Sequence, residues 1–345
     1  MRADAVSVIV PVHDGGHAFE RCLDSVGRLD PPPGEILVVD DASSDDSAHR
    51  AEAAGFRVIR RDRQGGPAVA RNQGAAVAAG DVLLFLDADV EAPPGTVGRV
   101  ASWFGENSAA AVPTPDAVIG SYDDDPGAEG FFSQYRNLLH RWVHQTSRSE
   151  VGSFWGACGA VRRLAFEAVG GFDPAYPTAS IEDIELGGRL VAAGYRIRLD
   201  KELEVKHLKR WTALSILRTD LLRRAIPWTR LILRRRHLGA DLNLAPAGRW
   251  SAVGALVATA AVLASPWLGV PALAAAAVAA GLVLTLNLPL YRFFCRRRGA
   301  GFAVAGAACH WCYFLYAAAG FAAGAVHFAV SGGLGGGPDR RGGER

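Results

Sequence analysis

The chain has 345 residues, of which 50% are hydrophobic, and it carries a formal net charge of +2 and five cysteines. This length accommodates one large domain and a second part, and five cysteines provide no disulfide framework for a protein that faces the cytosol. The small net charge hides an uneven distribution, because residues 1–200 carry 18 basic and 29 acidic side chains, whereas residues 201–249 carry 12 basic and 4 acidic ones.

The first part of the chain alternates strand-like and helix-like segments. The expected strands are residues 6–12, 36–39, 57–60 and 82–86. The expected helices are residues 19–26, a segment after Ser47, and residues 68–79. This alternation predicts an α/β domain of the doubly wound type with a parallel sheet.

The apolar run 82–86 ends in two carboxylates, Asp87 and Asp89. Ligands of open α/β sheets bind at the carboxyl ends of the strands. Two acids two positions apart at that edge can share a hard divalent cation through oxygen ligands, and such a cation is suited to hold a diphosphate. The alternative for this pattern alone is a loop whose acids cap the next helix.

Four segments, in their order and spacing, resemble a family 2 glycosyltransferase of the GT-A fold. They are Val10-Pro-Val12, Val38-Val-Asp-Asp-Ala-Ser-Ser44, Ala70-Arg-Asn-Gln-Gly74 and Phe85-Leu-Asp-Ala-Asp89. The resemblance covers roughly residues 5–210. It implies a Rossmann-like domain that transfers a sugar from a nucleotide-diphosphate donor with the help of Mg²⁺ or Mn²⁺.

The resemblance also implies which residues bind the donor. Asp41 would accept a hydrogen bond from the nucleotide base, and Pro11 and Val12 would lie against the base or the ribose. The further donor-binding residues that it implies are Arg71 near the diphosphate, Asp87 facing the ribose or the donor sugar, and the neighbouring Ala88. Asp89 would be the metal ligand, so that the cation bridges this carboxylate and the diphosphate and stabilises the leaving charge.

The region after Pro94 is less informative. A helix is expected at 96–104, a strand at 109–113, and a solvated acidic turn at 123–125. Residues 131–145 alternate aromatic and basic side chains. In related membrane enzymes such a stretch lines the acceptor side, but the same pattern fits a helix that packs on the sheet.

The segment 154–162 is rich in glycine and, in the family, similar segments pass close to the donor sugar, where absent side chains leave room. Asp183 matches the family's catalytic base, which takes the proton of the acceptor hydroxyl as that oxygen attacks the anomeric carbon. If the acceptor is a phosphate, Asp183 would position it instead. Its neighbours Glu182 and Glu185 have a simpler explanation, since acids are favoured in the first turn of a helix.

A last strand is expected at 197–199, before His207. In some relatives a histidine at this place completes the metal shell, so His207 is a second candidate metal ligand. Processive polysaccharide synthases carry a Gln-X-X-Arg-Trp motif nearby. Here Arg210 and Trp211 are present but His207 occupies the glutamine position, which argues against a cellulose- or hyaluronan-type polymerase.

Residues 212–238 interleave leucines and isoleucines with arginines. Bounded by Pro227, this stretch predicts two amphipathic helices in the membrane interface, with their basic side chains toward lipid phosphates. Nucleic-acid binding is the competing use of a basic run, but the position directly before a membrane segment argues against it.

The C-terminal part predicts a multi-pass membrane protein. Residues 251–291 and 299–338 contain no Asp, Glu, Lys or Arg, and a helix needs about 20 apolar residues to cross a bilayer. The expected spans are 251–268, 271–291 and 302–330. The arginine clusters 234–236 and 296–298 lie on one side of the first two spans and indicate the cytoplasm, and the N-terminus does not resemble a signal peptide.

These observations predict a cytoplasmic GT-A domain (1–206), interface helices (207–248), about three transmembrane helices (249–331) and a disordered tail (332–345). The expected activity is inverting, metal-dependent transfer of one sugar from a UDP- or GDP-sugar to a lipid or lipid-linked acceptor, a polyprenyl phosphate or a glycolipid, at the inner membrane. Two alternatives are a processive synthase that exports its polymer, and a non-catalytic membrane scaffold with a degenerate transferase domain.

Overall fold

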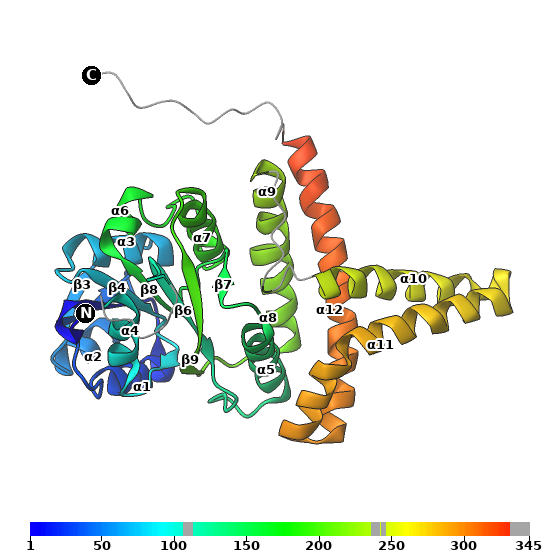
Figure 1. The fold of residues 1–345 in the computed structure, drawn as a ribbon, viewed down its shortest axis with the longest axis horizontal. Coiled ribbons are helices and arrows are strands. Elements are labelled where there is room, and N and C mark those ends of the chain that lie inside the picture. The colour runs from blue at the N-terminus through cyan, green and yellow to red at the C-terminus, as the bar shows by residue number, and fades with distance from the viewer. Residues whose placement is uncertain (106–112, 236–241, 243–245, 332–345) are drawn as a thin grey trace. The chain divides into compact units, whose positions relative to one another are not determined.

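The computed structural model describes residues 1–105, 113–235, 242 and 246–331 (Figure 1). The chain divides into two compact units, Met1–Ala213 and Leu214–Arg345. The first unit is an α/β domain and the described part of the second is helical. The strand predicted at 109–113, apart from Pro113, and the tail predicted at 332–345 lie outside the described residues.

A mixed β-sheet is the framework of the first unit. Its described strands are β1 (Val6–Val12), β2 (Glu35–Asp40), β3 (Arg57–Arg60), β4 (Val82–Leu86), β5 (Val90–Glu91), β6 (Ala117–Tyr122), β7 (Glu150–Val151), β8 (Cys158–Arg162) and β9 (Ile197–His207). They are ordered β3-β2-β1-β4-β8-β6-β9-β5, with β7 paired to β9. The first four run parallel, whereas β8 is antiparallel to both β4 and β6.

The helices α1 (Gly16–Val26), α2 (Ser47–Ala53) and α3 (Pro67–Val77) connect the four parallel strands. The predicted alternation of strands and helices is therefore confirmed. β1 and β4 are buried along their whole length, as expected for continuous apolar runs in a sheet covered on both faces. Because the four strands are parallel, the residues that follow β2 and β4 emerge at the same edge of the sheet.

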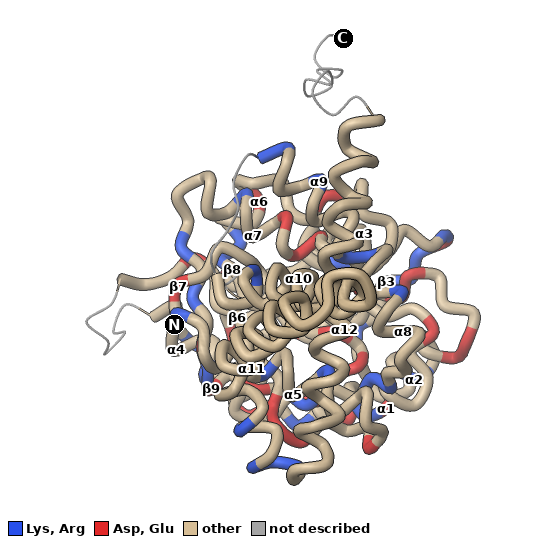
Figure 2. Tube along the Cα trace, turned by 90° about the vertical axis from the view of Figure 1, so that its right-hand side faces the viewer, with Lys and Arg blue, Asp and Glu red and all other residues tan. Residues whose placement is uncertain are grey.

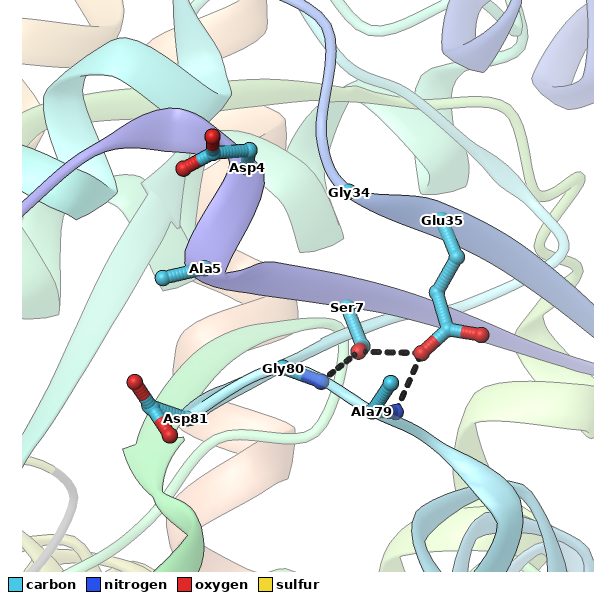
Figure 3. Close-up of a pocket in the computed structure, with 8 residues that line it drawn as sticks. All are labelled: Asp4, Ala5, Ser7, Gly34, Glu35, Ala79, Gly80 and Asp81. Atoms are coloured by element: carbon cyan, nitrogen blue, oxygen red, sulfur yellow. Dashed lines mark hydrogen bonds between the residues drawn. The ribbon is translucent and has the colours of Figure 1, made fainter.

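The opposite edge of the sheet has a pocket whose lining residues make polar contacts with one another (Figure 3). The Ser7 hydroxyl donates a hydrogen bond to Glu35 over 2.7 Å and accepts one from the Gly80 amide over 2.8 Å. The Ala79 amide donates to the same Glu35 carboxylate. These contacts join the amino ends of β1, β2 and β4.

β9 is longer than the sequence analysis predicted. The expected strand ended at Leu199, but β9 continues to His207. Residues 203–207 alternate between buried and more exposed positions, which is the period of a strand with one covered face. The charged residues on the other face concealed this pattern, and the extension pairs His207 with Val90 of β5.

Two further predicted helices are present, α4 (Thr96–Phe104) and α5 (Phe131–Thr146). α5 packs on the sheet, because His144 Nδ1 lies 2.9 Å from the Gly120 carbonyl and Arg141 donates to Glu204 of β9 over 2.6 Å. Of the two interpretations of this segment, packing on the sheet is confirmed, and the acceptor-side role stays a prediction. The acidic turn before α5 is not simply solvated, since Lys206 pairs with Asp123 and Asp125.

The helices α6 (Arg163–Ala168) and α7 (Glu182–Ala192) complete the domain. α7 approaches the loop before β8 closely at Gly187. A Cβ atom at this position would lie 2.1 Å from the backbone nitrogen of Phe154, so that only glycine fits. This close approach positions the first turn of α7 beside the glycine-rich loop.

The second unit begins with helical segments that run without a break in the sequence: α8 (Ala213–Arg218), a π-helical segment η2 (Thr219–Ala225) and α9 (Ile226–Arg235). Two helices bounded by Pro227 were predicted, but the helical backbone passes through this residue. Pro227 is the second residue of α9, and the residues before it wind in the wider π form.

Three helices are long and apolar enough to cross a membrane: α10 (Pro246–Leu268), α11 (Val270–Arg298) and α12 (Ala300–Val330). α10 and α11 form a hairpin that turns at Gly269, which has a φ of 62°. Gly254 of α10 allows close contact with Val283 of α11, and Asn287 donates to the Ser251 hydroxyl over 2.8 Å. Figure 2 shows the hairpin facing the viewer, without charged residues over most of its length.

We predict that Gly187→Ala destabilises the protein by about 1–3 kcal/mol, because the added methyl group meets backbone atoms that cannot move aside without shifting α7. Thermal unfolding of the detergent-purified chain measures this effect. Gly95→Ala is the matched control, since a Cβ atom there has no neighbour within 4 Å and the change should stay within about 0.5 kcal/mol. Equal stability of the two variants would contradict the packing described for α7.

Candidate active site

The carboxyl edge of the sheet brings together five of the predicted site residues. Asp87 and Asp89 follow β4, His207 ends β9, Arg71 lies in α3, and Asp183 lies in the first turn of α7. Two contacts pair four of them, Arg71 with Asp87 and Asp89 with His207, and the Gly156 loop beside Arg71 also donates a hydrogen bond to Asp183. Segments separated by more than 100 residues in the sequence thus meet where α/β sheets bind ligands.

Arg71 is the buried centre of this cluster. Its Nη2 donates to Asp87 Oδ1 over 2.7 Å and its Nη1 to Glu182 Oε1 over 3.0 Å, while the side chain is only 4% exposed. Burial disfavours the charge, but the carboxylates of Asp87 and Glu182 outweigh it and raise the pKa of Arg71. The guanidinium therefore orients both acids, and the predicted contact of Arg71 with a diphosphate stays a prediction.

The glycine-rich loop makes room for this guanidinium. A Cβ atom at Gly156 would lie 2.9 Å from Arg71 Nη2, so a side chain there would displace the arginine. The Phe172 ring covers the guanidinium from another direction, with its centroid 5.2 Å from the Arg71 Cζ. The loop thus passes next to the carboxylate cluster, where the sequence analysis expected the donor sugar.

Asp87 and Asp89 differ in their electrostatic surroundings although both side chains are about a third exposed, at 32% and 30%. Burial raises the pKa of Asp87, and the nearby Asp89 carboxylate adds to this effect against the opposing Arg71. For Asp89, burial opposes ionisation, but the hydrogen bond and charge of His207, together with Lys209, lower the pKa to about 2. The lowered pKa favours the ionised form of Asp89, and this partly exposed carboxylate would attract a cation.

His207 faces Asp89 in a fixed orientation. Its Nε2 lies 3.8 Å from Asp89 Oδ2, and the Leu208 amide donates to the Asp89 carbonyl over 2.8 Å. The Tyr122 ring stacks on the imidazole with a centroid distance of 4.2 Å and an interplanar angle of 12°. The plane of the imidazole is therefore set by the sheet, and its nitrogen is directed at the carboxylate.

The protein side chains alone form no complete metal cage. In the part of the chain that the structure describes, no three His, Cys, Asp or Glu side chains converge as metal ligands. Magnesium-type cations commonly use one or two carboxylates and take their other oxygen ligands from substrate phosphates and water. The pair Asp89 and His207 fits such a site, in which a diphosphate completes the coordination.

Asp183 lies beside the same loop. Its Oδ2 accepts a hydrogen bond from the Gly156 amide over 3.2 Å, and its Oδ1 accepts one from the Ile184 amide over 2.8 Å. The other two acids of this turn are held by arginines, Glu182 by Arg71 and Glu185 by Arg189. The first turn of α7 thus places Asp183 next to the cluster. Its acidic neighbours Glu182 and Glu185 form ion pairs that stabilise the fold.

Asp41 anchors a loop in this structure. Its carboxylate accepts hydrogen bonds from the Gly65 amide at 2.9 Å and the Gly66 amide at 2.7 Å, and Arg61 Nε lies 2.7 Å away. The side chain is 4% exposed. These contacts hold the loop that leads into α3. The predicted contact of Asp41 with a nucleotide base stays a prediction.

Pro11 and Val12 are buried at the end of β1, and the Val12 carbonyl accepts the Asp41 amide over 2.8 Å. Ala88 is half-buried between the two acids of the β4 turn. The structure therefore places these three residues at the same edge as the carboxylate cluster. Their predicted contacts with a donor stay predictions.

Sequence reasoning missed several members of the site. Glu182 was explained only as a helix-start residue, but it also binds Arg71 from a position 111 residues away. Tyr122 gave no signal at all, and Gly156 was noted only as part of the glycine-rich segment 154–162, because their contacts depend on pairings between distant segments. Asn72 is structural, since it exchanges hydrogen bonds with the backbone of Phe172.

Residues 7–170 match the protein family described as Glycosyl transferase family 2. The N-terminal unit is a family 2 glycosyltransferase domain. The predicted GT-A fold is supported by the structure of the mannosyltransferase PcManGT from Pyrobaculum calidifontis, solved with GDP-Man and Mn²⁺. The two structures superpose with a TM-score of 0.55 at 19% identity, over 92% of this chain and 87% of that one.

Two relatives of the family 2 domain are transferases with different named substrates. A pre-mycofactocin glycosyltransferase of Mycobacterium tuberculosis is 31% identical over 222 residues, covering 60% of this chain and 44% of that protein. An undecaprenyl-phosphate 4-deoxy-4-formamido-L-arabinose transferase of Sodalis glossinidius is 27% identical over 179 residues, covering 49% of this chain and 52% of that protein. The chain thus spans about half the length of these relatives.

We predict that Arg71→Ala destabilises the protein by about 3–5 kcal/mol, since it leaves Asp87 and Glu182 close together without their shared counter-charge. Chemical unfolding of the purified chain checks this value. Arg60→Ala is the control, because it removes an exposed pair with Glu52 whose loss costs at most about 1 kcal/mol. A small effect of Arg71→Ala would mean that the buried bridge does not hold the site together.

Proposed function

We propose that the protein is a metal-dependent, inverting glycosyltransferase that moves one sugar from a UDP- or GDP-sugar to a membrane-associated acceptor. The observation that carries this proposal is the meeting of Asp89, His207, Asp87 and Asp183 at the carboxyl edge of a family 2 domain. A binding scaffold would have no need of an ionised Asp89 facing an oriented histidine. The same cluster would supply a cation site for the diphosphate leaving group and a carboxylate for the acceptor oxygen.

Asp89 and His207 would hold Mg²⁺ or Mn²⁺ together with the donor diphosphate. A divalent cation at this place neutralises the negative charge that develops on the leaving diphosphate. Asp87, oriented by Arg71, would accept hydrogen bonds from hydroxyl groups of the ribose or the sugar. The structure solved with GDP-Man and Mn²⁺ shares this fold, which supports the donor and metal class.

Asp183 would act on the acceptor. An inverting displacement needs the acceptor oxygen opposite the leaving diphosphate, with a base that removes its proton. The Gly156 and Ile184 amides donate hydrogen bonds to the Asp183 carboxylate and hold it in place. A phosphate acceptor arrives without a proton to lose, and toward it Asp183 would serve as a positioning residue.

The apolar helices indicate where the acceptor is found. Three helices able to cross a membrane follow the domain, and the arginines beside them favour the cytoplasmic side of the cell membrane for the catalytic unit. A polyprenyl phosphate or a glycolipid is then the acceptor within reach. The undecaprenyl-phosphate transferase of Sodalis glossinidius supports the first choice.

We predict that Asp89→Ala weakens metal-dependent donor binding by more than about 10-fold, because it removes the carboxylate ligand of the cation. Calorimetric titration of UDP- and GDP-sugars into the purified chain, with Mn²⁺ and then with chelator, measures this loss. The exposed Asp24 supplies the control variant Asp24→Ala, which should bind like the unchanged chain. Donor binding that is unchanged by the chelator and by Asp89→Ala would reject the role of Asp89 as a metal ligand.

We predict that Asp183→Asn preserves donor binding and lowers the rate of transfer by about 10²–10⁴-fold if Asp183 is the general base. The asparagine keeps the shape of the side chain but only one of the two oxygens that accept from the Gly156 and Ile184 amides, so the stability of the variant is measured beside its activity. Donor titration and single-turnover transfer on the same preparation separate the two effects. Full turnover by this variant would remove Asp183 from the chemistry.

A further inference from the structure

The last long helix, α12, packs on the α10–α11 hairpin with residues of its first half, and its second half has other partners. Its early residues contact the base of the hairpin: Phe302 packs on Phe294, and His310 Nδ1 lies 3.3 Å from the Tyr291 hydroxyl. Phe314 then joins Ala255 of α10 and Val283 of α11 in one buried cluster, and a span would continue from there toward the hairpin tip. Tyr316 instead donates a hydrogen bond over 2.7 Å to Asp220 of η2.

The second half of α12 follows η2 and α9. A Cβ atom at Gly320 would lie 2.6 Å from the Ala225 Cβ, and one at Gly324 would lie 2.7 Å from the Thr229 Cβ. The contacts advance in the same direction along both segments, so the two helices run parallel. Glycines on α12 allow the close approach, as small residues do at packed helix interfaces.

This pairing places α12 beside a strongly basic helix. η2 and α9 carry the arginines Arg223, Arg224, Arg230, Arg234 and Arg235. The pairing direction places them alongside the part of α12 that follows Tyr316. Arginines are costly in the hydrocarbon region of a bilayer and are favoured among lipid headgroups. The second half of α12 therefore belongs where the arginines are stable, at the membrane surface.

The remainder of α12 is too short to cross alone. Residues 300–315 would extend about 24 Å at 1.5 Å per residue, whereas a hydrocarbon core is about 30 Å thick. Figure 1 shows α12 running beside α9, with α10 and α11 crosswise to both. Helices crosswise to a hairpin that penetrates the bilayer lie in the plane of its surface.

We propose that α12 is not a membrane span but an interfacial helix, paired with η2 and α9 on a bilayer surface of anionic phospholipid headgroups. Of the three candidate spans only the α10–α11 hairpin then crosses the membrane. The end of α12 at Val330 returns to the same side as the base of the hairpin. This inference does not depend on the proposed enzymatic function, because it uses contacts within the second unit alone.

Single-cysteine labelling of the full chain in membranes tests this topology. Cys22 and Cys158 are fully buried and are kept, whereas Cys309 and Cys312 are changed to Ser. Cys295 then reports the base of the hairpin. Two further variants are built with Cys295 also changed to Ser. Trp267→Cys reports the hairpin tip, where the Trp267 side chain of the wild-type chain is 82% exposed. Ser331→Cys reports the end of α12. A membrane-impermeant maleimide is added to spheroplasts and to inverted vesicles.

We expect Ser331→Cys to react from the same side as Cys295, and Trp267→Cys to react from the opposite side. Reaction of Ser331→Cys from the side of Trp267→Cys would overturn the proposal, since it requires a third crossing. If Ser331→Cys reacts from neither side, a fluorescent protein or an alkaline phosphatase is fused after Arg345. Each fusion partner is active on one side of the membrane only, so the active fusion shows on which side α12 ends.

The depth of the helix provides a second measurement. Val326 of α12 and Leu263 of α10 are both exposed, at 63% and 68%, so each tolerates a spin label. The nitroxide on Val326→Cys should show the accessibility to oxygen and to a nickel chelate that is typical of headgroup depth, while the one on Leu263→Cys shows hydrocarbon depth. Equal hydrocarbon depth at both positions would contradict the surface location of α12.

Discussion

The buried bridge from Arg71 to Asp87 and Glu182 is the interaction on which the candidate site depends. One guanidinium, 4% exposed, joins α3, the end of β4 and the start of α7. A buried arginine is stable only with paired acids, so each of the three elements must be in place for the others to pack. The bridge orients Asp87 directly and fixes the turn that carries Asp183, and Gly156 and Gly187 provide the space that the close packing needs.

The second constraint is the pairing of β5 with β9, which brings His207 to Asp89. His207 reaches this position because β9 extends eight residues beyond the predicted end at Leu199. Tyr122 stacks on the imidazole and fixes its plane. In the proposed function, Asp89 and His207 would form a cation-binding side of the site, and Asp183 would form an acceptor side. This division matches the two opposed tasks of an inverting transfer.

The sequence was sufficient for features that depend on local patterns. The buried strands β1 and β4 follow from their continuous apolar runs, and Asp87 and Asp89 stand out because a charged pair ends such a run. The uncharged stretches likewise predict long apolar helices. Features that depend on distant pairing could not be predicted: the partner of Arg71 lies 111 residues away, and nothing in the sequence around Tyr122 indicates His207. The relation of α12 to α9 is of the same kind, since hydropathy describes a helix but not its neighbours.

The most direct test of the account is transfer of labelled sugar from UDP- and GDP-sugars to lipid in membranes that contain the full chain. The account predicts that one donor passes its label into the organic-soluble fraction as a single sugar per lipid, and that a chelator abolishes this transfer while added Mn²⁺ or Mg²⁺ restores it. Label that accumulates only as an insoluble polymer, or that is never transferred from any donor, would contradict the account.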